Sequence, residues 1–82
     1  MKRNHLELFF EKNCPVCEEV LQTLHLFARH HGLEFHTYDR DRESKAFRER
    51  RVFICPATFL NGCLVFYGTV STEVLQTKLT TF

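Results

Sequence analysis

Hydrophobic and polar positions along the chain predict a series of short elements separated by turn residues. Residues 6–10 form an apolar run, interrupted only by Glu7, with the length of a buried strand. Residues 15–31 carry apolar side chains at helical spacing, so one face of this helix should be buried, and Gly32 is suited to end it. The apolar positions of that face are Cys17, Val20, Leu21, Leu24, Phe27 and Ala28.

In the middle of the chain, a segment of alternating apolar and polar side chains is followed by a strongly charged segment. Residues 33–39 alternate between apolar and polar side chains, which predicts a half-buried strand at a sheet edge. In the charged segment that follows, Asp41 is a candidate cap for a short helix that runs to about Arg51. Ala46 and Phe47 should face inward, and the charges form a solvated face. The alternative is a docking role for Arg48, Arg50 and Arg51.

A hairpin is predicted in the last third of the chain. Residues 57–60 and 63–67 have the composition of strands, and they flank Asn61 and Gly62, the strongest short hairpin signal. Both strands are largely apolar, as expected of strands that lie between helices. We therefore interpret Cys63, at the start of the returning strand, as a packing residue.

A final helix should begin at Ser71 or Thr72 and end at Leu79. Its expected inward residues are Val74, Leu75, Leu79 and Phe82. The predicted order is therefore β-α-β-α-β-β-α. Strands joined by a helix pair in parallel with a right-handed crossover, whereas the hairpin is antiparallel. We expect an α/β fold in which residues 1–82 form a single domain, a four-stranded mixed sheet flanked by helices.

Composition and charge limit the classes of binding partner and the cellular compartment that we expect. The formal net charge of +1 gives no reason to expect nucleic acid or an anionic membrane as partner. The apolar run after the basic N-terminus is too short for a secretory signal, and we expect no transmembrane segment. We therefore expect a reducing, cytoplasmic location and a monomer. In that location four cysteines indicate catalysis or metal binding more than a disulfide framework.

Two cysteines, Cys14 and Cys17, stand between the first predicted strand and the long helix in the motif Cys-Pro-Val-Cys. The first N–H groups of a helix have no intrahelical partner, and the helix dipole places about half a positive charge there. A thiolate, the reactive form of cysteine, is stabilised at such a place. Pro15 fits the first helical position because no N–H is needed there. Cys17 lies nearly one turn further on the same side, so the two sulfurs can form a disulfide.

The two thiols are expected to differ in exposure. Cys17 begins the apolar face of the helix and should be recessed, whereas Cys14 precedes that face and should be exposed. This asymmetry suits an attacking thiol and a resolving thiol. Lys12 is the nearest cation in the sequence, and it either stabilises a thiolate or contacts an anionic substrate, or is a solvated loop lysine.

Other roles for the cysteine pair stay open at this point. A structural disulfide across so short a loop would contribute only about 2 kcal/mol, which favours a chemical role. A metal or iron–sulfur carrier would use Cys14 with Cys17 or Cys55, but no second close cysteine pair completes a four-ligand site, and we expect no metal. A docking module without catalysis would keep the fold and show no thiol exchange.

The chain resembles a glutaredoxin-like member of the thioredoxin fold over almost its whole length. The resemblance rests on the strand at residues 6–10, the Cys-Pro-Val-Cys motif, Pro56 at the opening of the third strand, the Asn-Gly hairpin and Gly68. It implies a thiol–disulfide oxidoreductase that needs no bound cofactor and serves cell redox homeostasis. Its implied partners are protein disulfides or glutathione mixed disulfides as substrates, and glutathione or a reductase as electron donor.

The resemblance also implies roles for individual residues. Cys14 matches the nucleophile that forms the mixed disulfide, and Cys17 matches the resolving cysteine. Pro56 matches the cis-proline of the family, and the backbone of Cys55 before it matches the segment that pairs with an extended substrate chain. Further expected substrate contacts are Lys12, Pro15, Val16, Gly68, Ser71 and Thr72.

Several residues depart from the glutaredoxin pattern. Val16 stands where an aromatic residue is usual, and the acidic pair that holds the glutathione amino group is replaced by residues 69–72. The hydroxyls of Ser71 and Thr72 and the helix N–H groups can still hold a carboxylate. The tryptophan before the thioredoxin motif is absent, which disfavours thioredoxin proper. Cys55 is either a third thiol of the site or a small stand-in for threonine or valine.

Overall fold

The structure is a computed structural model that describes residues 4–81. The element order is the one predicted from the sequence. The elements are β1 (His5–Phe10), α1 (Pro15–His31), β2 (Glu34–Asp39), α2 (Ser44–Arg50), β3 (Ala57–Leu60), β4 (Cys63–Tyr67) and α3 (Thr72–Thr81). Gly32 ends α1 in the left-handed conformation, with φ 68°, as expected of a helix C-cap glycine.

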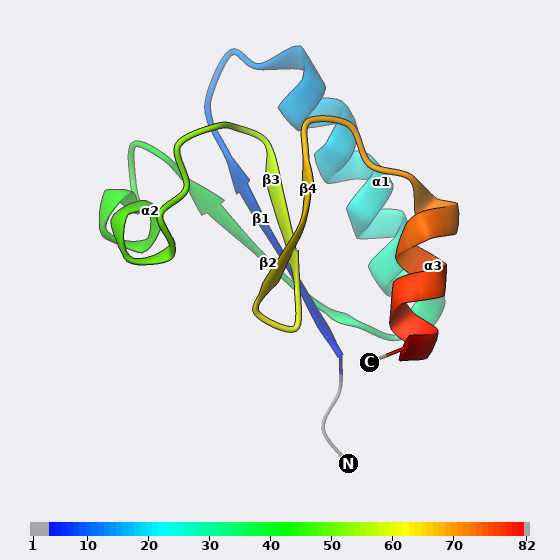
Figure 1. The fold of residues 1–82 in the computed structure, drawn as a ribbon. Helices are drawn as coiled ribbons and strands as arrows, with labels where there is room; N and C mark the ends of the chain where they lie inside the picture. Colours follow the sequence, from blue (N-terminus) through cyan, green and yellow to red (C-terminus); the bar gives the residue numbers. More distant parts are fainter. Residues whose placement is uncertain (1–3, 82) are drawn as a thin grey trace.

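The strands form one four-stranded sheet in the order β2-β1-β3-β4. β1 pairs with β2 in parallel and with β3 antiparallel, and β4 closes an antiparallel hairpin with β3. Figure 1 shows α1 and α3 on one side of this sheet and α2 on the other. The predicted α/β class with a mixed four-stranded sheet flanked by helices is therefore confirmed, and β2 lies at the edge, as expected.

The sheet divides the apolar interior into two clusters. On the side of α1 and α3, Leu6 and Leu8 of β1 pack with Leu24 of α1 and Leu75 of α3. On the side of α2, the buried residues are Phe9, Phe47, Val52, Ala57 and Phe59. Successive side chains of β1 therefore pack into opposite clusters, which is the period-2 alternation of a strand covered on both faces.

Glu7 is a charged residue inside the α2-side cluster, with only 3% of its surface exposed. Its carboxylate accepts hydrogen bonds from Arg50 Nη1 at 2.9 Å, from Arg50 Nη2 at 2.6 Å and from the Tyr38 hydroxyl at 3.0 Å. The Arg50 guanidinium also lies 5.8 Å from the ring centre of Phe9 and 5.4 Å from that of Phe59. This group of residues anchors α2 to the centre of the sheet.

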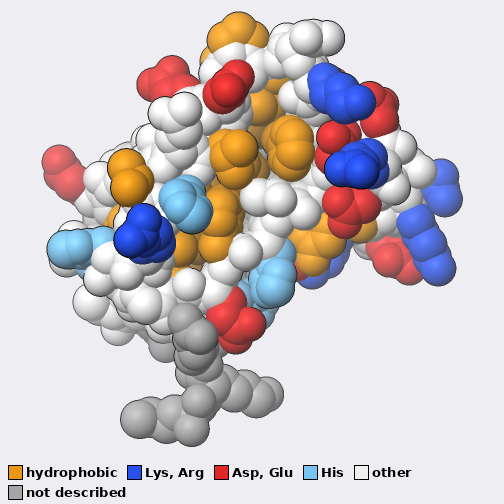
Figure 2. Space-filling view, turned by 180° about the vertical axis from the view of Figure 1, so that it is seen from behind, with side chains coloured by type: hydrophobic (Ala, Val, Ile, Leu, Met, Phe, Trp, Pro, Cys, Tyr) orange, Lys and Arg blue, Asp and Glu red, His pale blue; other side chains and the backbone are white. Residues whose placement is uncertain are grey.

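The Glu7 carboxylate is ionised in this environment. Burial alone raises the pKa of Glu7, but the hydrogen bonds from Arg50 and Tyr38, with the Arg50 charge, outweigh it and leave the pKa lowered. The sequence interpretation of a solvated helix face did not include the ion pair between Arg50 and Glu7. Arg48, Arg50 and Arg51, at the end of α2, are all exposed, which agrees with the expected solvated face. Figure 2 shows charged side chains gathered on the α2 side of the molecule.

Three further expectations need correction. Asp41 does not cap α2, which begins at Ser44 after an N-cap at Glu43; the Asp41 N–H instead bonds the Asp39 carboxylate at 2.9 Å. Cys63 is exposed because β4 is an edge strand. Val74 is 44% exposed because α3 contacts the core through the side of the helix that carries Leu75. The expectation for Phe82 lies outside the described residues.

None of the helices between residues 4 and 81 is long and apolar enough to cross a membrane.

Candidate active site

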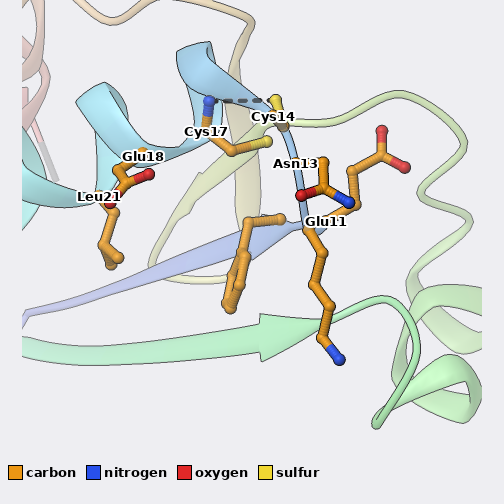
Figure 3. Close-up of a pocket in the computed structure, with 8 residues that line it drawn as sticks. Glu11, Asn13, Cys14, Cys17, Glu18 and Leu21 are labelled. Atoms are coloured by element: carbon orange, nitrogen blue, oxygen red, sulfur yellow. Dashed lines mark hydrogen bonds between the residues drawn. The ribbon is translucent and has the colours of Figure 1, made fainter.

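The first turn of α1 presents its N–H groups to the sulfur of Cys14. Cys14 is the N-cap residue of α1 and has an extended backbone, and Pro15 occupies the first helical turn. The backbone N–H of Cys17 donates a hydrogen bond to Cys14 Sγ at 3.1 Å (Figure 3), so the sulfur takes the place of the usual capping oxygen. This N–H and the positive end of the helix dipole stabilise negative charge on the sulfur.

Cys17 lies beneath this cap on the buried face of α1, with 2% of its surface exposed. Burial, followed by its hydrogen bond with Cys14 and the negative charge that Cys14 can carry, raises the pKa of Cys17 to about 12. The backbone of Glu11 offsets a part of this effect. Cys17 is thus a protonated thiol at neutral pH and is recessed, as predicted from helical spacing, whereas Cys14, which was expected to be exposed, is half-buried.

Alkylation should reveal this difference between the two thiols. We expect brief treatment of the reduced native protein with iodoacetamide to modify Cys14 and to leave Cys17 unmodified between pH 6 and 10. With a pKa of about 12, only about 1% of Cys17 is thiolate at pH 10. Mass spectrometry of proteolytic fragments measures each site, and denatured protein, in which both cysteines react, is the control. Cys17 modification that rises with a midpoint near pH 9 would contradict the assignment.

The predicted substrate side of the site lies at the same end of the sheet. The Cys55–Pro56 peptide bond is cis, and the Pro56 carbonyl accepts a hydrogen bond from the Gly68 N–H at 2.8 Å. Gly68 has φ 75°, a conformation that glycine adopts without steric cost. Because Phe9 of β1 pairs with Ala57 of β3, the end of β1 that leads to Cys14 adjoins the start of β3.

Arg40 joins the two loops that carry the cysteines. Its guanidinium donates to Glu11 Oε2 at 3.3 Å and to the Phe53 carbonyl at 2.8 Å, and it lies 5.3 Å from the ring centre of Phe47. Burial raises the pKa of Cys55, and the Arg40 charge works in the opposite direction. Arg40 was missed in the sequence because it belongs to a charged run that is typical of a solvated segment.

A pocket of about 210 Å³ opens beside the cysteine pair (Figure 3). Its lining residues are Phe10, Glu11, Lys12, Asn13, Cys14, Cys17, Glu18 and Leu21. Of the substrate-binding residues expected from the sequence, Lys12 lines this pocket. The structure therefore brings Lys12 together with both cysteines, on a side of the site to which β3 and β4 contribute no lining residue.

The other expected contacts are distributed around the site. Pro15 and Val16 are exposed on the first turn of α1. Ser71 accepts a hydrogen bond from the Val74 N–H at 3.2 Å and so caps α3. Thr72 lines a separate groove, together with residues from the second half of α1 and from α3. The structure thus separates Thr72 from the pocket beside the cysteines.

Two exposed apolar residues of this region had no expected role from the sequence. Phe53 and Ile54, directly before Cys55, are 77% and 59% exposed. Their only sequence signal is a hydrophobic run that ends at a proline and has no alternating pattern. Among residues 4–81, no group of three or more histidine, cysteine, aspartate or glutamate side chains is arranged to hold a metal ion.

A four-stranded mixed sheet flanked by helices, with a cysteine that caps the first helix and a recessed cysteine one turn later, is the arrangement of a small thioredoxin-fold oxidoreductase. Residues 4–80 match the thioredoxin domain family, and the chain belongs to this family. Thiol–disulfide oxidoreduction is the general chemistry of such proteins. A comparison with curated protein sequences found no significant match.

Solved structures with the same fold include thioredoxins from several parasites. The thioredoxin of Fasciola hepatica is 23% identical, with a TM-score of 0.76 over 95% of this chain and 80% of its own. Thioredoxin-2 of the malaria parasite is 20% identical, with a TM-score of 0.84 over 100% and 86%. A domain of the alkylhydroperoxide reductase AhpF from Enterococcus faecalis is 20% identical, with a TM-score of 0.75 over 94% and 38%. At these identities the likeness concerns the fold.

Proposed function

We propose that this protein reduces disulfides through Cys14 and Cys17, as a glutaredoxin-like or thioredoxin-like oxidoreductase of the cytoplasm. The observation that carries the proposal is the hydrogen bond from the Cys17 N–H to Cys14 Sγ at the start of α1, above a buried Cys17 thiol. This arrangement suits Cys14 as the attacking thiol and Cys17 as the resolving thiol.

In the first step the Cys14 thiolate attacks a substrate disulfide. A bond forms between Cys14 Sγ and one substrate sulfur, and the other substrate sulfur leaves with the electron pair and takes up a proton. In the second step Cys17 loses its proton and attacks Cys14 Sγ. The Cys14–Cys17 disulfide forms and the second substrate thiol is released, so the substrate gains two electrons and two protons.

The raised pKa of Cys17 fits this order of events. Part of the increase comes from its hydrogen bond with Cys14 and from the negative charge on Cys14. Both contributions disappear once Cys14 is held in a mixed disulfide, so the pKa of Cys17 falls when Cys17 must attack. Before that moment burial keeps Cys17 protonated and prevents it from competing with Cys14 for substrate.

The substrate that fits this site is an extended segment with apolar side chains. Val16 lies within the motif, Phe53 and Ile54 lie directly before Cys55, and all three are exposed and apolar. Main-chain pairing at Cys55, before the cis-proline, would hold such a segment with little demand on its sequence. Lys12 is available for an anionic group, as in glutathione. We propose a monomer that needs no bound cofactor and takes its electrons from glutathione or a reductase.

Equilibration across glutathione redox buffers tests the proposal. After acid quenching, mass spectrometry of each cysteine should show reversible Cys14–Cys17 bridging between about −180 and −270 mV. A glutathione adduct on Cys14 along the way supports a glutaredoxin-like role, and bridging without the adduct supports reduction by a protein reductase. A pair that never bridges in these buffers overturns the proposed function.

A further inference from the structure

A third thiol adjoins the reactive pair. Cys55 directly precedes the cis-proline and is half-buried, packed against the cluster on the α2 side of the sheet. Burial is the largest cause of the raised pKa of both Cys55 and Cys17; negative charge on Cys14 adds to the first, and charge on Cys55 adds to the second. The placement of Cys55 itself follows from the pairing of β1 with β3.

Two sets of contacts, one between strands and one made by a side chain, hold Cys55 in this place. The pairing of Phe9 with Ala57 sets the start of β3 beside the end of β1, and Cys55 and Cys14 extend from these two strand ends. Arg40 then connects the loop that leads to Cys14, through Glu11, with the loop that leads to Cys55, through the Phe53 carbonyl. The two loops are therefore fixed to each other by the sheet and by one guanidinium group.

We propose that Cys55 is a second resolving thiol, which attacks Cys14 in a mixed disulfide and forms a Cys14–Cys55 disulfide in competition with Cys17. The inference rests on the proposed function, because it requires Cys14 to form mixed disulfides. In this step Cys55 loses its proton to solvent and a bond forms between its sulfur and Cys14 Sγ. The bond from Cys14 to the substrate sulfur breaks, and that sulfur leaves with the electron pair and takes up a proton. The two protein thiols are oxidised and the substrate is reduced.

The surroundings of the two candidate resolving thiols favour competition between them. Burial opposes ionisation of both Cys17 and Cys55, but Cys17 is almost fully enclosed whereas Cys55 is half-buried. Arg40 adds a positive charge that favours the Cys55 thiolate. Cys55 also directly precedes the cis-proline, where an extended substrate would pair with the backbone.

The test uses full-length protein in which Cys63→Ser is the common background. Trypsin cleavage after Lys12, Arg29, Arg51 and Lys78 places Cys14 in a peptide of residues 13–29 and Cys55 in one of residues 52–78. Cys63 would share the second peptide, so its removal makes a link between the two peptides unambiguous. Cys63 is exposed at the far end of β3 and β4, away from the site, which makes its replacement a neutral background.

The decisive variant is Cys17→Ser, treated with oxidised glutathione, quenched with acid and analysed by mass spectrometry. The proposal expects most of the protein to lose the initial glutathione adduct and to carry a link between residues 13–29 and 52–78. The matched control, Cys17→Ser with Cys55→Ser, should stop at the Cys14–glutathione adduct. Circular dichroism checks the fold of each variant, and Cys55→Ala replaces Cys55→Ser if the serine protein is unfolded.

The remaining outcomes separate the inference from the proposed function. A Cys17→Ser protein that keeps its glutathione adduct on Cys14 as stably as the double variant overturns the role of Cys55 and leaves the proposed function in place. A Cys14 that forms no adduct in either variant and no bridge in the parent protein overturns both.

Discussion

A Cys14→Ser protein is expected to lose all disulfide-reducing turnover while it keeps the parent fold. A serine hydroxyl is not ionised at neutral pH and does not attack disulfides, so the first bond of the cycle cannot form. Serine is also a favourable N-cap residue, and its oxygen can accept the Cys17 N–H in place of sulfur. The replacement therefore removes the chemistry without removing the helix cap. Reduction of insulin disulfides in the presence of dithiothreitol measures the loss.

Cys63→Ser is the matched control for this experiment. It removes an exposed thiol at the other end of the sheet, and we expect its turnover to equal that of the parent protein. Thermal unfolding should give similar midpoints for the parent and both variants. Turnover that survives in the Cys14→Ser protein would show that a different thiol attacks the substrate and that the assignment of Cys14 is wrong.

An Arg50→Ala protein is expected to be less stable by about 3 kcal/mol, the lower end of the range for a broken buried ion pair. The replacement leaves the Glu7 carboxylate, which is 3% exposed, with the Tyr38 hydroxyl as its hydrogen-bond donor. The Arg50 side chain itself is 36% exposed, which is why the lower end applies. For a domain of this size the loss is a large part of a total of about 4–12 kcal/mol. Urea unfolding measures the free energy.

Arg48→Ala is the control on the same helix, because Arg48 is exposed and belongs to no ion pair among the described residues. Its free energy of unfolding should stay within about 0.5 kcal/mol of the parent value. If Arg50→Ala and Arg48→Ala have equal free energies of unfolding, the contacts between Arg50 and Glu7 contribute nothing to the stability of the protein.

Acid should remove the same stabilisation. The pKa of Glu7 is lower in the folded protein than the ordinary value of 4.5, because the hydrogen bonds from Arg50 and Tyr38 outweigh burial. Glu7 therefore contributes stability that is complete above pH 4.5 and is lost as the pH falls through the lower folded pKa. Urea unfolding between pH 3 and 7 should show this loss in the parent protein and a smaller one in Glu7→Gln. Equal slopes for the two proteins would contradict it.

The arrangement of elements was predictable because local signals agreed with the tertiary structure. The helical spacing of apolar residues in α1 fixed the buried face, and the same spacing placed Cys17 inside and Cys14 at the cap. The Asn61-Gly62 turn fixed the hairpin. These signals depend only on residues that are close in the sequence, and the local structures that they predict are present in the fold.

The parts that the sequence did not reveal depend on distant partners. An acidic residue inside an apolar strand requires a cation, but three arginines near the end of α2 were equally available to Glu7, and only the packing of α2 selects Arg50. Arg40 reaches Glu11 and Phe53 across loops that no periodic pattern connects. Cys63 was expected to be a packing residue because its strand is apolar, yet β4 is an edge strand of the sheet and leaves Cys63 exposed.

The division of the apolar interior by the sheet has a consequence for motion. The helix that carries both redox thiols belongs to the larger cluster with α3, whereas the seven-residue α2 is too short to persist without its packing. Amide protons of α2 should therefore exchange with solvent through local openings that leave α1 closed. Because Arg40 packs on Phe47 of α2 and holds the loop before the cis-proline, such openings would loosen the substrate side of the site while the thiol side stays rigid. One half of the site would then adapt to differently shaped chains, and the other would keep its reactive geometry.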